Sequence, residues 1–128
     1  RMTVALTQLD AAIASLQASL GSHWDKTVVM TLTEFGRTAV PNGSGGTDHG
    51  TASALFLAGG AVVGGRVMAD WPGLVEARLY QGRDLAPTAD LRDVLAGVLQ
   101  QHIKLDAAAL AKVFPDPALA PVKGLARA

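Results

Sequence analysis

The segment Thr27–Gly50, TVVMTLTEFGRTAVPNGSGGTDHG, carries the clearest structural pattern in this chain. It begins with an apolar run at residues 28–32, which is typical of a buried strand. The sequence EFGR follows at residues 34–37, and a glycine-rich loop then leads to Asp48 and His49. Ligands bind at the carboxyl ends of strands in open α/β sheets, so these polar residues predict a functional site.

Helical patterns surround this segment on both sides. Apolar residues recur every three or four positions over residues 3–20, which predicts an amphipathic helix packed on a sheet. Residues 54–58 form a second apolar run, interpreted as another buried strand. A further helix is expected after Thr88 or Asp90, either of which is a suitable N-cap, and a last short helix over residues 106–113. The order of helix, loop and strand indicates the α/β class.

Composition excludes several classes of protein and site. The 128 residues fit one domain, and eleven basic residues balance eleven acidic ones, so binding to nucleic acid or an anionic membrane is not expected. There is no cysteine, which excludes disulfides and thiolate metal sites. The longest apolar stretch, residues 52–63, is too short to span a bilayer. Any bound metal must therefore be held by oxygen and imidazole ligands.

The amino-terminal end of the sequence suggests a piece of a longer protein. It begins Arg1-Met2-Thr3, which is neither a signal peptide nor a usual start, and an amphipathic segment follows. Residues 115–128, which contain prolines and a glycine, are expected to form a terminal tail on the surface. An incomplete sheet would expose apolar edges, so self-association of the piece is also expected.

Four side chains in the segment Thr27–Gly50, called the organising segment from here on, are candidates for a site. Asp48 and His49 place a carboxylate beside an imidazole, a pair suited to a divalent metal such as zinc or manganese. Glu34 is a candidate third ligand or general base, and Arg37 a candidate for binding an anionic oxygen. The alternative is structural, with Glu34 and Arg37 paired to hold the loop, and both interpretations remain open. No nucleophile elbow or phosphate-binding loop is present, so no catalytic residue is assigned.

Several motifs in order resemble a known bacterial family. They are TLTEFGRT, GTDHG, LAGGAVVGGRV, DWPGL, GRDLAPTADLRDVLAGVL and a closing VFP. Together they resemble the carboxyl-terminal part of proteins called domain of unknown function 1501, over about residues 27–114. That family is similar to the superfamily of alkaline phosphatases, sulfatases and cofactor-independent phosphoglycerate mutases. The resemblance implies that residues 1–114 form the carboxyl-terminal portion of an alkaline phosphatase-like or sulfatase-like domain. Such a portion would contain part of a doubly wound, mostly parallel sheet flanked by helices, incomplete in this chain.

The superfamily resemblance allows two alignments of the metal ligands. Its members place Asp-His-Gly directly after a buried strand, and a further metal-binding histidine downstream. In one alignment, residues 48–50 are the Asp-His-Gly itself. In the other, which we prefer, Glu34-Phe35-Gly36 takes that position and His49 is the downstream histidine. Phe35 then stands where an imidazole ligand is expected, which is a departure from the superfamily pattern.

The resemblance also implies a function for the longer protein. It predicts a metal-dependent hydrolase of phosphate or sulfate esters, with an anionic ester as substrate. Glu34, Asp48 and His49 would be metal ligands and Arg37 would lie near the anion. The nucleophile would come from the missing amino-terminal part, so this piece alone is expected to be inactive. A periplasmic or extracellular location is implied by analogy, and a non-catalytic relative that keeps the fold for binding or surface assembly is the alternative.

Overall fold

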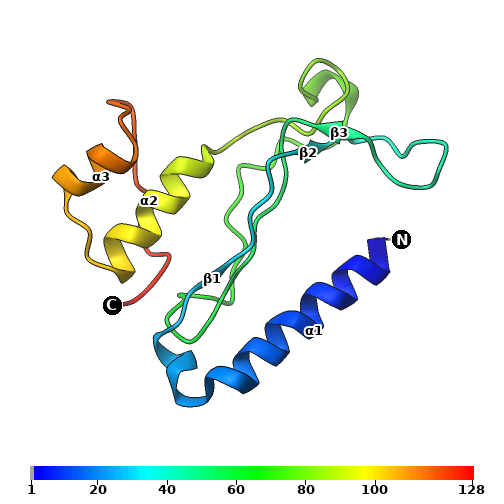
Figure 1. Ribbon diagram of the computed structural model, residues 1–128. Helices are drawn as coiled ribbons and strands as arrows, with labels where there is room; N and C mark the ends of the chain where they lie inside the picture. The colour runs from blue at the N-terminus through cyan, green and yellow to red at the C-terminus, as the bar shows by residue number, and fades with distance from the viewer. Residues whose placement is uncertain (1) are drawn as a thin grey trace. The chain divides into compact units, whose positions relative to one another are not determined.

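The computed structural model describes residues 2–128 (Figure 1). These residues divide into two compact units. The first unit comprises residues 2–19, 30–56 and 68–88. The second comprises residues 20–29, 57–67 and 89–128. Arg1, on which the expectation of a longer protein partly rests, lies outside the described residues. The organising segment falls mainly in the first unit, so the candidate site belongs to that unit.

The amino-terminal helix α1, Met2–Leu20, confirms the helix predicted from the apolar stripe. None of its residues is buried, and the side chains of Leu6 and Leu16 are 50% and 40% exposed. The expected packing of this helix on a sheet is therefore not observed. A short 3₁₀ helix, η1 (Gly21–Lys26), follows it.

The strands are short and form two separate pairs. Strand β1 (Val29–Met30) pairs with β4 (Leu57–Ala58), and β2 (Gly36–Arg37) pairs with β3 (His49–Gly50). The β2–β3 pair is antiparallel. The predicted doubly wound, mostly parallel sheet is therefore wrong for this chain, which has three α-helices and only short antiparallel strand pairs in its described part.

The connection between β1 and β4 explains why the parallel prediction fails. Neighbouring parallel strands need a long crossover, which is usually a helix packed on the sheet. Residues 31–56 instead contain β2, β3 and loops, and no helix. The apolar runs are also less buried than a central strand requires, since Leu32 is 55% and Phe56 52% exposed. Without a crossover helix to cover them, these runs form only two-residue ladders.

The second unit is built around helix α2, Leu91–His102, followed by α3, Ala107–Val113. Both helices begin where an aspartate caps them. The carboxylate of Asp90 accepts a hydrogen bond from the Arg92 amide at 2.8 Å, and Asp106 accepts one from the Ala109 amide at 2.8 Å. Such caps satisfy amides that have no partner within the helix. The two predicted helices are therefore confirmed.

The carboxyl-terminal residues complete the core of the second unit. The amide of Val63 donates to the Leu125 carbonyl at 2.9 Å, and the amide of Arg127 donates to the Ala61 carbonyl at 2.7 Å. The buried apolar residues found in the described part of the chain all lie in this unit: Ala61, Val62, Ala96, Val98, Leu110, Leu125 and Ala126. Within residues 115–128, expected to form a surface tail, Leu125 and Ala126 are buried.

Candidate functional site

Strands β2 and β3 bring together the two predicted parts of the site. Arg37 lies opposite His49 in the antiparallel register. One residue before β2, the ring of Phe35 stacks on the imidazole of His49, with centroids 4.5 Å apart and an angle of 12° between the planes. The residues around Glu34 and the residues around Asp48 therefore lie side by side, although a long loop separates them in the sequence.

Two glycines permit this close approach. A methyl group on Gly36 would come within 2.3 Å of the backbone of Ala52, and one on Gly50 within 2.5 Å of the carbonyl carbon of Arg37. Backbone atoms at such distances must shift to make room for a side chain. Glycine at both positions therefore allows β2, β3 and the segment after β3 to pack together.

The loop before Asp48 is organised by one side chain, that of Asn42. Its amide oxygen accepts hydrogen bonds from the Ser44 amide at 3.1 Å, from the Ser44 hydroxyl at 2.8 Å and from the Gly46 amide at 3.1 Å. Its amide nitrogen donates to Oδ1 of Asp48 at 2.8 Å. This arrangement is typical of an asparagine that replaces backbone partners in a turn. The hydrogen bond from Asn42 fixes one oxygen of the Asp48 carboxylate and so restricts the orientation of the exposed Asp48 side chain.

Arg37 is exposed and holds the same loop from the other side. Its Nη1 donates to the carbonyl of Thr47 at 3.0 Å. The ion pairs found among residues 2–128 do not include one between Glu34 and Arg37. The structural role considered for Arg37 is therefore met by the Thr47 carbonyl, and the Glu34–Arg37 pairing expected in that interpretation is not present.

The donor types fit a divalent metal, but the described residues do not form a complete metal site. Asp48 and His49 offer a carboxylate and an imidazole, and Glu34 is exposed nearby in the chain. Within residues 2–128 no three histidine, aspartate or glutamate side chains are grouped closely enough to hold an ion. A catalytic zinc site normally uses three protein ligands. Asp48 and His49 therefore offer fewer donors than such a site requires.

The stacking of Phe35 on His49 restricts the ring without blocking its nitrogens. The lone pair of a neutral imidazole nitrogen lies in the plane of the ring, whereas Phe35 covers a face of that ring. His49 is an exposed residue. Phe35 therefore orients His49, and binding of a cation at the ring edge remains sterically open.

Two buried polar side chains that the sequence interpretation missed lie next to this loop. Thr38 is 7% exposed; its hydroxyl accepts from the Asp48 amide at 3.1 Å and donates to the Val40 carbonyl at 3.2 Å. Asp84 is 5% exposed, and its Oδ2 accepts from the Thr51 hydroxyl at 2.9 Å. The only sequence signal for Asp84 is its place in the DLAPT motif.

Asp84 remains ionised in this environment. Burial by itself would raise the pKa of its carboxyl group, but the hydrogen bond from Thr51 and the contact with Arg83 outweigh that effect and lower the pKa. Nε of Arg83 lies 2.8 Å from Oδ1, close enough for an ion pair although the N–H is not aligned on this oxygen as in a hydrogen bond. Oδ1 of Asp84 is therefore a buried oxygen that lies beside the Arg83 guanidinium but accepts no hydrogen bond among the described residues.

The backbone around Asp84 runs along the edge of β2 that does not face β3. The Ala39 amide donates to the Arg83 carbonyl at 3.0 Å, and the Leu85 amide donates to the Arg37 carbonyl at 3.2 Å. An isolated antiparallel bridge joins Thr38 to Asp84. Residues 83–85 and β3 therefore flank β2 on its two edges.

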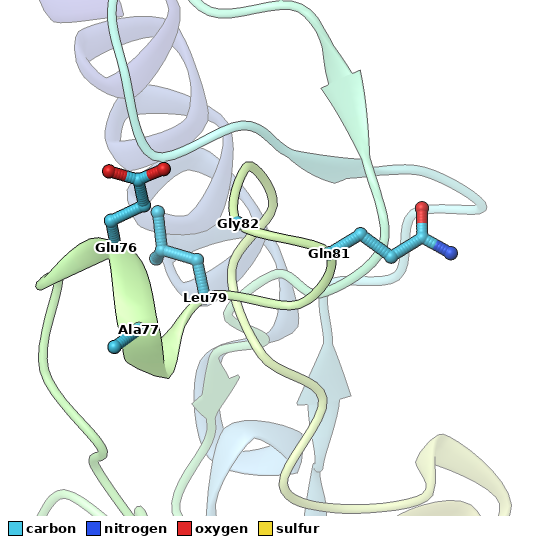
Figure 2. A pocket seen from close by; sticks show the side chains of 5 residues that line it. All are labelled: Glu76, Ala77, Leu79, Gln81 and Gly82. Carbon is cyan, nitrogen blue, oxygen red and sulfur yellow. The ribbon is translucent and has the colours of Figure 1, made fainter.

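A shallow hollow in the first unit does not coincide with the candidate site. It measures about 600 Å³ and is lined by residues of helix η2 (Glu76–Arg78) and of the turn that follows: Glu76, Ala77, Leu79, Gln81 and Gly82. Its two long polar side chains, Glu76 and Gln81, extend in different directions (Figure 2). Ligand sites normally have convergent polar groups. This hollow therefore adds no residue to the site.

Comparisons with known proteins give one match. No curated protein and no solved structure matches the sequence. Within residues 2–128, no helix combines the length and the apolar character needed to cross a bilayer. The family model described as "Protein of unknown function (DUF1501)" matches residues 1–114. Because that match covers most of the 128 residues, the chain belongs to the DUF1501 family.

Proposed function

We propose that this chain contributes metal ligands to a hydrolase that acts on phosphate or sulfate esters. The ligands are Asp48 and His49, with Glu34 as a third donor, and Arg37 lies near the anionic group of the substrate. The remaining ligands and the nucleophile come from outside this sequence, so the chain alone is inactive. The proposal includes a relationship between the family and the alkaline phosphatase and sulfatase superfamily, and export from the cytoplasm. Both rest on the motif resemblance.

The observation that supports this proposal most directly is the contact between Phe35 and His49. It brings the segment that contains Glu34 beside the Asp48-His49 pair, and it orients an imidazole whose nitrogens stay open to a cation. The hydrogen bond from Asn42 orients the neighbouring carboxylate. Bound metal in such a site would stabilise charge on the transferred group.

The metal content of the full-length protein that carries this sequence tests the proposal. It is measured by elemental analysis for the unaltered protein, for His49→Ala and for the matched control His23→Ala. His23 is an exposed histidine of η1, in the other unit, so its loss should not affect the site. We expect His49→Ala to lose most of the bound metal and His23→Ala to retain it. Equal metal content in all three proteins would overturn the proposal.

Hydrolysis assays compare the activity of the full-length protein with that of the isolated chain. With p-nitrophenyl phosphate and p-nitrophenyl sulfate, we expect turnover by the full-length protein that a chelator abolishes. The 128-residue chain should show none. Robust turnover by the isolated chain would contradict the assignment of the nucleophile to another part of the protein.

The second candidate is a non-catalytic relative that keeps this surface for binding or assembly, including self-association. Two observations favour it: Phe35 occupies the position of an expected imidazole ligand, and Arg37 already holds the Thr47 carbonyl. The first unit also exposes large apolar side chains, among them Phe56, Trp71 and Leu74, which are 52%, 64% and 54% exposed. Metal-free protein whose sedimentation coefficient rises with concentration would support this candidate over the hydrolase.

A further inference from the structure

We infer that Asp84 is a positioning residue, which fixes the Asp48-His49 segment through its hydrogen bond with the Thr51 hydroxyl. The bond joins residues 33 positions apart, with 2.9 Å between Oγ1 of Thr51 and Oδ2 of Asp84. Thr51 lies two residues after His49, so its side chain controls the backbone on the carboxyl side of the imidazole. The inference deepens the proposed function, since it names what holds the proposed ligands in place.

The other end of the same segment is fixed by Thr38. The Asp48 amide donates to the Thr38 hydroxyl at 3.1 Å, and the Thr38 amide donates to the Asp48 carbonyl at 3.1 Å. Residues 48–51 are therefore held at their start by Thr38 and at their end by Asp84. These two are the buried polar side chains among residues 2–128. Between the two attachments lie both proposed ligands, Asp48 and His49.

Asp84 is well placed to act as an anchor because its own backbone is held on both sides. Its amide donates to the Tyr80 carbonyl at 3.0 Å, and its carbonyl accepts from the Tyr80 amide at 3.0 Å. The bridge to Thr38 ties it to the edge of β2. Arg83 lies 2.8 Å from its other carboxylate oxygen and keeps the group charged. A hydrogen bond to a charged acceptor is about twice as strong as one between neutral groups.

The side chain of Thr51 is held by Asp84. It is exposed, and the hydroxyl bond to Asp84 is the side-chain hydrogen bond that it makes within the described residues. Without this bond, the residues after His49 would still be attached through the pairing of Gly50 with Gly36 and through the backbone bond from the Arg37 amide to the Ala52 carbonyl. We therefore expect loss of the Thr51 hydroxyl to loosen the stacking of His49 on Phe35 while the rest of the unit stays folded.

The test is a set of NMR spectra of the whole 128-residue chain, which follow the ring protons of His49. The face of Phe35 displaces these resonances by its ring current, and Phe35→Leu gives the scale of that displacement. We expect Thr51→Val to lose most of the displacement and Thr51→Ser, which keeps the hydroxyl, to retain it. Ser53→Ala, which alters a neighbouring exposed hydroxyl, is the matched control and should retain it too.

A double-mutant comparison assigns the effect to Asp84. Asp84→Ala should lose the same displacement as Thr51→Val, and the combination should lose no more than either change alone, because the two side chains act as one unit. If Asp84→Ala unfolds by circular dichroism, the contrast between Thr51→Val and Thr51→Ser still decides the inference. Unchanged His49 resonances in folded Thr51→Val would overturn it.

The same variants in the full-length protein separate this inference from the proposed function. Loss of the ring-current displacement of His49 in Thr51→Val, with no metal in any protein including the unaltered one, would support the positioning role and overturn the hydrolase proposal. Metal content that falls in His49→Ala but not in Thr51→Val, together with unchanged His49 resonances in Thr51→Val, would support the hydrolase proposal and overturn the positioning role of Asp84.

Discussion

The ring of Phe35 lies almost parallel to the imidazole of His49, with 4.5 Å between centroids and 12° between planes. This contact places an apolar ring where the superfamily resemblance leads us to expect a second imidazole. It also places the side chain of position 35 beside His49.

Phe35→His should therefore increase metal affinity. A second imidazole beside His49 adds a ligand to the Asp48-His49 pair, and imidazole is a favoured ligand of zinc. We expect the dissociation constant for Zn²⁺, measured by isothermal titration calorimetry of the whole chain, to fall by about tenfold, or about 1.4 kcal/mol. Phe56→His, at another exposed phenylalanine of the first unit, is the matched control. An equal gain in both variants would show that the site is not specific.

The helices were predictable from the sequence because their signals are local. The aspartates at positions 90 and 106 begin α2 and α3 as N-caps, and the stripe of residues 3–20 forms α1. The strands were not, because an apolar run such as residues 28–32 specifies burial but not the partner that provides it. The partner segment in this chain returns antiparallel, and the ladders stop after two residues.

The candidate site was only partly predictable for a similar reason. Glu34, Arg37, Asp48 and His49 are visible as polar residues grouped around one glycine-rich loop. The roles of Thr38 and Asp84 depend on a bridge between distant segments, and Thr51 reaches Asp84 across 33 positions. No spacing rule within the sequence indicates such a contact. The stacking of Phe35 on His49 likewise follows from the strand register, which the sequence did not reveal.

Gly97→Ala should destabilise the second unit. A methyl group at this position of α2 would come within 2.2 Å of the Val122 carbonyl oxygen and 3.1 Å of Cδ1 of Leu125. Overpacking costs about 1–3 kcal/mol, which exceeds the gain of about 1 kcal/mol from replacing a helical glycine by alanine. We expect a lower free energy of unfolding in urea. The control Gly64→Ala has only Cγ1 of Val62 at 3.9 Å, so its stability should change little; a more stable Gly97→Ala protein would contradict the packing seen here.

Gln101→Met should release the carboxyl-terminal residues from α2. Nε2 of Gln101 donates to the Val122 carbonyl at 2.7 Å, and its Oε1 accepts from the Leu125 amide at 2.8 Å. Methionine has a similar length but leaves these two backbone groups without partners, at a cost of about 1–3 kcal/mol for each that stays buried. Faster hydrogen exchange of the Leu125 amide is the measurement. Gln100→Met alters the neighbouring exposed glutamine and should leave that exchange rate unchanged.

Asp90 gives the second unit a stability that depends on pH. The side chain and the backbone amide of Arg92 both donate to its carboxylate and lower its pKa from 3.8 to about 2. Because the folded state has the lower pKa, it binds this proton less readily than the unfolded state. The stabilisation is therefore fully present above pH 3.8 and is lost as the pH falls through about 2.

Asp90→Asn isolates that contribution to acid stability. Asparagine is an equally good N-cap but cannot ionise, so the variant should keep the helix start and lose the charged contact with Arg92. We expect its midpoint of thermal unfolding, followed by circular dichroism, to fall less between pH 4 and pH 2 than that of the unaltered chain. Asp25→Asn makes the same change of charge at an exposed position of η1 and serves as the control. If Asp90→Asn and the unaltered chain lose stability in parallel over this range, the carboxylate of Asp90 is not the group that makes the second unit sensitive to acid.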